Sequence, residues 1–265
     1  MPSSRSLSRR ALLWVASGAA LALGTRPTGA RAQTGTAVYA DPSLKAALQT
    51  LLPHLQETAG ASLILQFGDV SGALSHDSRL LHDVVIVVGA GNMARLVEIG
   101  QVEPPTDLVI SGLALVAALD RPGPDAVTRG MDLTEWVDRR HRLAVIDPER
   151  NALGETSLQA LRAIGWDEGV SRRVTLAPTP GTVLDWVAHG EAALGVALAN
   201  TARRDGRVRF VGPFPPETHP PVRVQVAVRA GTPVDAPARA VVHALYGEAA
   251  RTAFLTDGLS PQVAR

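Results

Sequence analysis

Apolar residues recur along this chain with the two spacings that mark strands and helices. Short β-branched runs such as Val84 to Val88 are typical of strands buried on both faces of a parallel sheet. Between such runs, apolar residues return every three or four positions, which predicts helices with one buried face. Because the two patterns alternate from end to end, the sequence favours an α/β fold with parallel strand pairing.

The expected strands are apolar runs that end at small or polar residues: 36–40, 63–67, 84–88, 108–119 with a break at 111–112, 143–146, 174–177, 193–197 and 222–228. The expected helices carry apolar residues at helical spacing: 41–59, a short helix after Ser71, 92–100, 132–140, 155–164, 182–189, 236–246 and 248–255. Pro53 lies inside the first helix and predicts a kink or a break there. Residues 208–221 are rich in proline, which predicts an extended connection.

The first residues have the pattern of an export signal. Arg9 and Arg10 precede an apolar run at 11–23 that is too short to span a bilayer comfortably. Ala30-Arg31-Ala32 has the form of a cleavage site. We therefore expect a twin-arginine signal peptide at 1–32. The chain has no cysteine that could carry a lipid anchor, so we expect the mature protein to be free in the periplasm.

The composition excludes several classes of function. The 265 residues include 26 Lys and Arg against 25 Asp and Glu, so we expect no nucleic-acid or anionic-membrane surface. The absence of cysteine removes disulfides, Fe–S clusters and thiolate zinc sites. The histidines lack H-E-x-x-H spacing and no G-x-S-x-G elbow occurs, so we expect neither a metal site nor an enzyme.

Two turns of small residues follow expected strands and open expected helices. Ser43 follows strand 36–40, and Ser71-Gly72 follows strand 63–67. The free N–H groups at a helix start, together with the helix dipole, favour an anion. A serine at such a position can also be a helix cap and nothing more, so both readings stay open.

The order of these and other short motifs resembles the periplasmic molybdate-binding proteins of ABC importers. The resemblance rests on Ser43-Leu44, Phe67-Gly68 with Ser71-Gly72-Ala73-Leu74, Asp83-Val84-Val85-Ile86, Asp147-Pro148-Glu149 with Gly154, Gly190-Glu191-Ala192 with Gly195, and Pro215 with His219-Pro220-Pro221. It extends over nearly the whole mature chain. It implies an α/β, two-lobed fold of the type II periplasmic-binding-protein kind, in which each lobe is a mostly parallel sheet flanked by helices.

The resemblance also implies how the lobes are divided and what they do. Two hinge crossovers would join a first lobe at 36–112 and 212–256 to a second at 113–211, with the ligand at the carboxyl ends of the strands. The protein would capture a small tetrahedral oxyanion, molybdate or tungstate, by neutral hydrogen-bond donors. It would deliver this ligand to an inner-membrane ABC permease, as a monomer without cofactor, catalytic role or nucleic-acid partner.

The resemblance assigns the ligand to a few positions. Ser43 matches a hydroxyl and N–H donor, Ser71 with its neighbour Gly72 a second one, and Leu153 a backbone N–H donor. Two further positions depart from the family pattern. Leu198 stands where the family has a tyrosine hydroxyl, and Pro180, which has no N–H, stands where it has a backbone donor.

We expect Gly181, Asn200 or Thr201 to supply a substitute donor. Asp41 and Asp69 flank the two donor turns and would repel a dianion unless they point away. The same fold binding another small anion, or one that no longer binds molybdate, therefore stays as an alternative.

A second alternative is an exported NAD(P)-dependent oxidoreductase. Gly89-Ala90-Gly91 with Ala94 reads as G-x-G-x-x-A after a strand, and Asp120 follows the next apolar run. However, a dinucleotide-binding fold usually places this fingerprint on its first strand, and two β-units precede it here. The simpler interpretation is that the motif forms a turn of small residues beside the ligand cleft and binds no nucleotide.

Overall fold

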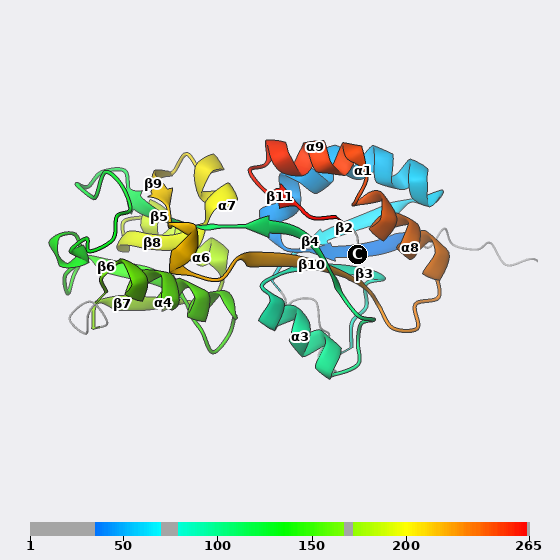
Figure 1. Ribbon diagram of the computed structural model, residues 1–265, viewed down its shortest axis with the longest axis horizontal. Coiled ribbons are helices and arrows are strands. Elements are labelled where there is room, and N and C mark those ends of the chain that lie inside the picture. The colour runs from blue at the N-terminus through cyan, green and yellow to red at the C-terminus, as the bar shows by residue number, and fades with distance from the viewer. Residues whose placement is uncertain (1–34, 70–78, 167–171, 264–265) are drawn as a thin grey trace, which may run out of the picture. The chain divides into compact units, whose positions relative to one another are not determined.

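The computed structural model describes residues 35–69, 79–166 and 172–263 of the chain. These residues form two β-sheets, each flanked by helices (Figure 1). The strand order is β11-β4-β10-β3-β1-β2 in the first sheet and β7-β6-β8-β5-β9 in the second. The expected α/β class is confirmed. The expected signal at 1–32 and the short helix after Ser71 lie outside the described residues.

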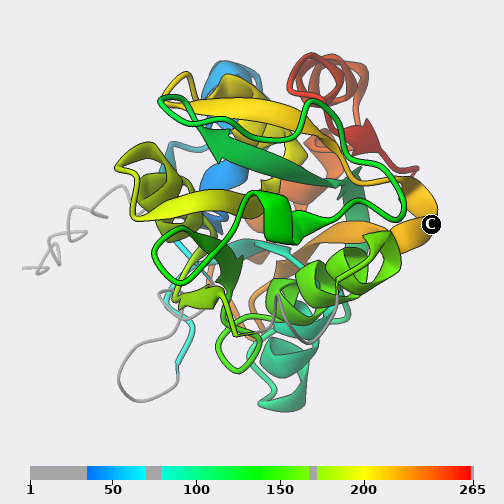
Figure 2. The same ribbon diagram turned by 90° about the vertical axis from the view of Figure 1, so that its left-hand side faces the viewer.

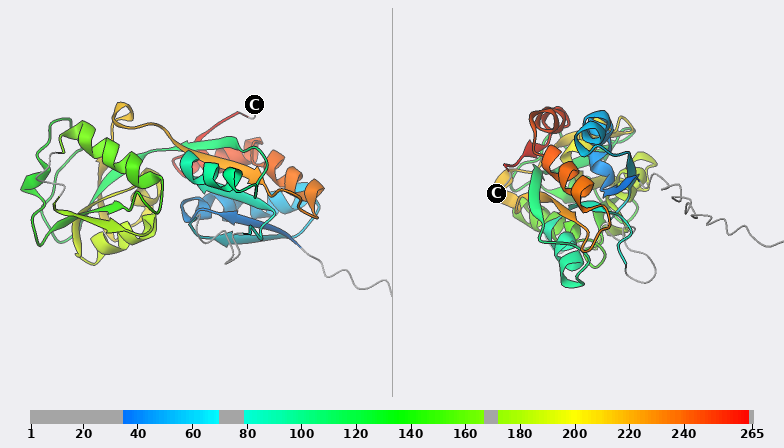
Figure 3. Two further views of the ribbon diagram at one scale, coloured as in Figure 1. Left: turned by 90° about the horizontal axis from the view of Figure 1, so that it is seen from below. Right: turned by 90° about the vertical axis from the view of Figure 1, so that its right-hand side faces the viewer.

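The first sheet combines strands from both ends of the described chain: β1 Thr36–Ala40, β2 Leu63–Phe67, β3 Val84–Val88, β4 Thr106–Ser111, β10 Val222–Val228 and β11 Ser260–Pro261. Its helices are the 3-10 turn η1 Pro42–Leu44, α1 Lys45–Ala59, α3 Ala90–Glu98, α8 Asp235–Ala244 and α9 Glu248–Thr256. Figures 1 and 3 show α1, α8 and α9 on one face of this sheet and α3 on the other.

Strand β3 is buried on both faces, as its β-branched run predicts. Val84, Ile86 and Val88 belong to the core that contains the leucines of α1. Val85 and Val87 belong to a second cluster with residues of α3. Because side chains of a strand alternate between faces, this one run supplies both cores.

The second sheet is built from the middle of the chain: β5 Leu113–Ala118, β6 Arg142–Ile146, β7 Val174–Ala177, β8 Ala192–Leu198 and β9 Val208–Pro213. Its helices are η2 Leu133–Glu135, α4 Leu153–Ile164, α6 Pro180–Ala188, α7 Ala199–Arg204 and η3 Pro216–Thr218. Figure 2 shows α4 along one side of this sheet.

A glycine in β8 allows α6 to pack closely on the second sheet. A Cβ atom on Gly195 would lie 2.8 Å from Val183 Cγ1 and 2.8 Å from Val187 Cγ2, closer than carbon atoms pack. A side chain at this position would therefore push α6 away from the strand whose end carries Leu198.

Strand pairing is mixed in both sheets, which corrects the expectation of mostly parallel sheets. β1 pairs in parallel with β2 and β3, and β6 pairs in parallel with β7 and β8. In contrast, β10 is antiparallel to β3 and β4, and β5 is antiparallel to β8 and β9. The antiparallel strands are those by which the chain passes from one sheet to the other and back. Since β9 ends at Pro213, the expected division at 211 falls inside a strand.

The remaining differences from the expected elements are local. α1 continues through Pro53 without a break, and Pro53 is exposed, so that water can satisfy the carbonyl that loses its partner. Only the 3-10 turn η2 forms within 132–140. α3 begins at Ala90, two residues early, while α7 and β11 were not expected. Among the described residues, no helix has the length and apolar character needed to cross a membrane.

Candidate functional site

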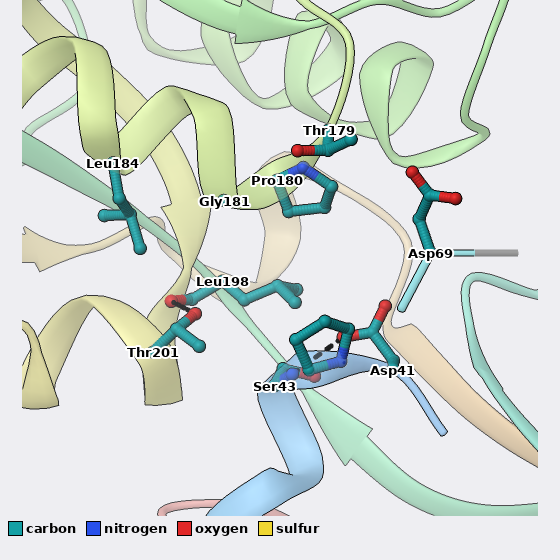
Figure 4. A pocket seen from close by; sticks show the side chains of 10 residues that line it. Asp41, Ser43, Asp69, Thr179, Pro180, Gly181, Leu184, Leu198 and Thr201 are labelled. Carbon is teal, nitrogen blue, oxygen red and sulfur yellow. Dashed lines mark hydrogen bonds between the residues drawn. The ribbon is translucent and has the colours of Figure 1, made fainter. Parts of the chain in front are cut away.

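A cavity of about 160 Å³ lies where strands of both sheets end (Figure 4). The segments after β1 and β2 supply one wall, and the start of α6, the end of β8 and α7 supply the other. This volume is smaller than the roughly 300–1,000 Å³ of pockets for drug-sized ligands, which suits a ligand of only a few heavy atoms. The cavity lies at the carboxyl ends of strands, as expected from the sequence.

Three of the predicted ligand positions line this cavity together: Ser43, Gly181 and Thr201. Leu198 and Pro180, the two departures from the family pattern, line it as well. The sequence analysis did not predict Thr179 and Leu184. Thr179 lies just before α6 and Leu184 lies within it, and neither residue has a sequence feature that marks a ligand position. Ser71 and Gly72 lie outside the described residues.

Ser43 occupies the first turn after β1, and its polar atoms already have partners. Its backbone N–H donates to Oδ1 of Asp41 at 2.9 Å, so Asp41 caps the helix that follows. Its carbonyl accepts from Nδ2 of Asn200 at 2.8 Å. The N–H that an anion would need is therefore engaged by a carboxylate of the protein.

The second wall offers few free donors. The Thr201 hydroxyl donates to the Leu198 carbonyl at 2.9 Å, so its hydrogen is engaged within α7. The Thr179 hydroxyl caps α6 by accepting from the N–H of Thr182 at 3.2 Å. Pro180 follows without an N–H, and Gly181 is the next position that carries one.

Among the described residues that line the cavity, the charged groups are two carboxylates, Asp41 and Asp69. Asp41 is only 8% exposed. Burial, and to a smaller extent the negative charge of Asp69, raise the pKa of Asp41, although hydrogen bonds from Ser43 oppose the shift. The sequence analysis anticipated repulsion at these two positions, and both residues line the cavity (Figure 4).

Leu153 lies elsewhere. Its side chain is 1% exposed and does not line the cavity, and its N–H donates to Oδ1 of Asn151 at 3.0 Å. Asn151 in turn accepts from Nδ2 of Asn92 in α3 at 2.8 Å. The first turn of α4 is thus tied to the first sheet.

Two polar clusters connect elements of the two sheets. In the Asn92–Asn151 cluster, Oδ1 of Asn92 also accepts from the N–H of Ala152 at 3.0 Å. In the Arg204 cluster, Arg204 of α7 forms an ion pair with Asp257 after α9 and donates to the Ser43 carbonyl at 3.2 Å. The Arg204 cluster holds α7, which lines the cavity, against the segment after β1, which also lines it.

A second cavity of about 290 Å³ adjoins the first and shares Asp69 and Thr179 with it. It contains the cations that the first cavity lacks, Arg95 and Arg150, together with Glu149. Arg150 also pairs with Asp147 at 3.5 Å. Positive charge therefore borders the site without lining its inner part.

The dinucleotide reading meets two obstacles in the structure. The turn after β3 does form, with Gly89 at φ +89° opening α3. A Cβ on Gly91 would lie 2.9 Å from the Cβ of Ala152, so the α4 segment covers the turn. Asp120 follows β5 and therefore belongs to the other sheet. Within the described ranges, no three His, Asp or Glu side chains are placed to hold a metal ion.

The family model described as "Bacterial extracellular solute-binding protein" matches residues 36–260. The chain is 25% identical over 217 residues to the molybdate-binding protein ModA of Escherichia coli K12, covering 81% of this chain and 84% of that protein. These matches confirm the resemblance drawn from the ordered motifs.

Comparison with solved structures identifies the fold. The periplasmic molybdate-binding protein of Azotobacter vinelandii has a TM-score of 0.68 and 18% identity, over 85% of this chain and 99% of that one. The IdiA/FutA protein of Trichodesmium, in complex with iron and citrate, has a TM-score of 0.55 and 17% identity, over 86% and 87%. The two-lobed periplasmic-binding-protein fold is confirmed. Proteins of this fold hold ligands of different charge, so the fold alone does not identify the ligand.

Proposed function

The chain belongs to the bacterial extracellular solute-binding proteins, and we propose that it captures a small tetrahedral oxyanion for an ABC importer of the molybdate type. The molybdate-binding relatives support the importer type. The observation that carries the proposal is the cavity in which Ser43, Gly181 and Thr201 meet at strand ends. Ser71 and Gly72 complete the proposed donor set, which is neutral throughout. Leu153 is proposed to support α4 rather than to touch the ligand, because its N–H is engaged by Asn151.

We propose that the ligand sits between two lobes. The division expected at 36–112 with 212–256, and 113–211, agrees with sheet membership except that β9 runs on to Pro213 and that β11 of the first sheet lies beyond residue 256. The crossovers would be the β4–β5 junction at Gly112 and the segment after β9. A periplasmic location follows from the named relatives, and we further propose export by the twin-arginine route, a monomeric state and delivery to an inner-membrane permease.

The proposed affinity is lower than that of a site with every donor in place. Each hydrogen bond to a charged group contributes about 1.5–3 kcal/mol, so losing one costs roughly ten- to a hundredfold in affinity. Leu198 brings no donor, and Pro180 brings no N–H. The alternative of another small anion stays within this proposal, because the donor chemistry is shared by all tetrahedral oxyanions.

Calorimetry with molybdate, tungstate, sulfate and phosphate tests the proposal. The wild-type protein should bind at least one of them, and Ser43→Ala and Ser71→Ala should each weaken binding. Leu198→Tyr should leave it unchanged or strengthen it, because the new hydroxyl would face the cavity. Leu255→Ala on exposed α9 is a matched control that should not change the affinity. Absence of heat with every tetrahedral anion would refute the ligand class.

A further inference from the structure

Asp41 already accepts a hydrogen bond from the backbone N–H of Ser43, which is a donor that an anion in the cavity would need. Its Oδ1 accepts from the Ser43 N–H at 2.9 Å, and the carboxylate lines the cavity. The residue is fixed at the end of β1, since its own N–H donates to the Ile86 carbonyl of β3 at 3.0 Å. A ligand therefore meets a buried carboxylate beside the Ser43 N–H.

The electrostatics of the cavity oppose a fully ionised dianion. Asp69 adds a second carboxylate to the lining, and neither Arg95 nor Arg150 lines this cavity. The Coulomb repulsion from each carboxylate doubles when the charge of the anion doubles. A protonated carboxyl would remove one of these charges. It would also provide an O–H donor while its other oxygen continues to accept.

We propose that Asp41 sets the charge of the ligand, and that the cavity takes up an oxyanion together with one proton from solvent, which binds the Asp41 carboxylate. This inference rests on the proposed function and specifies how the site works. No bond other than that of the proton forms or breaks. The protonated Asp41 then donates to the anion and replaces one of the donors that Leu198 and Pro180 do not supply.

The groups around Asp41 are consistent with protonation at this position. The segment after β2 contributes Asp69, and α6 contributes residues without titratable side chains. Tyr39 of β1 has its pKa raised to about 12, mainly by burial, and stays protonated. On α7, Arg204 reaches the Ser43 carbonyl but is paired with Asp257. Burial, and to a smaller extent the charge of Asp69, raise the pKa of Asp41, which favours its protonation.

Tungstate and perrhenate provide a charge test, because both are tetrahedral oxyanions and they differ by one unit of charge. Calorimetry in two buffers of different ionisation enthalpy, at about pH 7, counts the protons taken up with each anion. Since perrhenate does not protonate in this range, a proton taken up with it binds the protein. We expect uptake close to one proton in the wild type and close to none in Asp41→Asn.

Asp41→Asn should also bind tungstate at least about tenfold more tightly than the wild type does, and its affinity for perrhenate relative to tungstate should be lower than that of the wild type. Asn and Ser both cap helices well, so Asp41→Asn and Asp41→Ser are expected to fold. Asp69→Asn is the matched control. It removes one charge from the same cavity but leaves the acceptor of the Ser43 N–H in place, so proton uptake should persist.

Wild-type tungstate binding without proton uptake, or equal uptake by Asp41→Asn, would overturn the inference and leave the proposed function standing. Proton release on binding would overturn it in the same way. Absence of binding by every variant from about pH 5 to pH 8, a range that includes conditions in which a raised carboxyl pKa protonates, would overturn both.

Discussion

Replacing Asn92 by alanine should destabilise the protein by about 2–4 kcal/mol, because it removes two buried hydrogen bonds and one partly buried one, worth about 0.5–1.5 kcal/mol each. Asn92 is 7% exposed. Its Nδ2 donates to Val88 and Asn151, both at 2.8 Å, and its Oδ1 accepts from Ala152 at 3.0 Å. The Ala152 N–H would lose this partner, so the expected loss in free energy of unfolding is larger than that from removing one exposed hydrogen bond.

A double-mutant cycle isolates the link between the two sheets. Asn151→Ala removes the partner of Asn92 and the cap of the Leu153 N–H, but leaves the bond from Ala152 to Asn92. The coupling between Asn92→Ala and Asn151→Ala should therefore be about 1 kcal/mol, the value of one amide–amide hydrogen bond. Urea unfolding, followed by the fluorescence of Trp136, Trp166 and Trp186, measures the free energies of all four proteins.

The exposed ion pair between Arg162 and Glu155 at 3.2 Å is a matched control for the cycle. Exposed pairs contribute little, so its coupling should be below about 0.5 kcal/mol and should fall with added salt. If the Asn92 and Asn151 losses add within about 0.3 kcal/mol, the buried amides are not energetically linked, and this account of how α3 holds α4 is wrong.

Three further outcomes are expected. Asp41→Asn should raise the melting temperature at about pH 8 and give no advantage near about pH 4. Because the folded pKa of Asp41 is raised above its unfolded value, the stability that Asp41 contributes is fully present below the unfolded pKa and is lost as pH rises through the folded pKa; an unchanged difference between the two proteins across this range would contradict the reasoning. Gly195→Ala should cost about 1–3 kcal/mol in urea unfolding, because the new Cβ would overlap Val183 and Val187 of α6, whereas the same change at exposed Gly206, where a Cβ meets open space, should cost less. Arg9→Lys combined with Arg10→Lys should keep the precursor in the cytoplasm, and normal periplasmic accumulation of that double variant in cell fractionation would refute the proposed route.

The strands were the most predictable part of the fold. Runs such as 84–88 coincide with the observed strand because a continuous β-branched segment has few alternatives to burial between two layers. The short helix α7 and the two-residue strand β11 could not be predicted, since neither is long enough to show a periodic pattern. The segment 132–140 has the composition of a helix, but the chain there forms only one 3-10 turn, and its apolar residues pack individually.

The mixed pairing of the sheets could not be inferred from local pattern either. A strand such as β10 shows the same apolar residues whether its neighbours run parallel or antiparallel. Its direction follows from the path of the whole chain, which leaves the first sheet after β4 and returns to it at β10. The family resemblance implied that the chain returns to the first lobe, but it also implied mostly parallel sheets, so the mixed pairing was predicted by neither source.

The place of the cavity at strand ends was predictable, but the hydrogen bonds that the predicted donors already make were not, and the reason is the same at two places. Asp41 accepts from the N–H of Ser43, and Asn151 accepts from the N–H of Leu153, each two residues further along. Asp and Asn side chains make this local bond readily, and a helix start offers the N–H to them before any ligand arrives. An N–H donor that is predicted from the sequence can therefore bind an anion only if it gives up the hydrogen bond that it already makes.

At Asn151, giving up the bond from the Leu153 N–H would also disturb the hydrogen bond to Asn92, so the bond to Leu153 is expected to stay. At Asp41 the competing acceptor is itself ionisable, and protonation lets the carboxyl remain in place and become a donor. We therefore expect the carboxylic acid before the Ser43 helix start to permit ligand binding there, and the amide before the Leu153 helix start to keep a structural role.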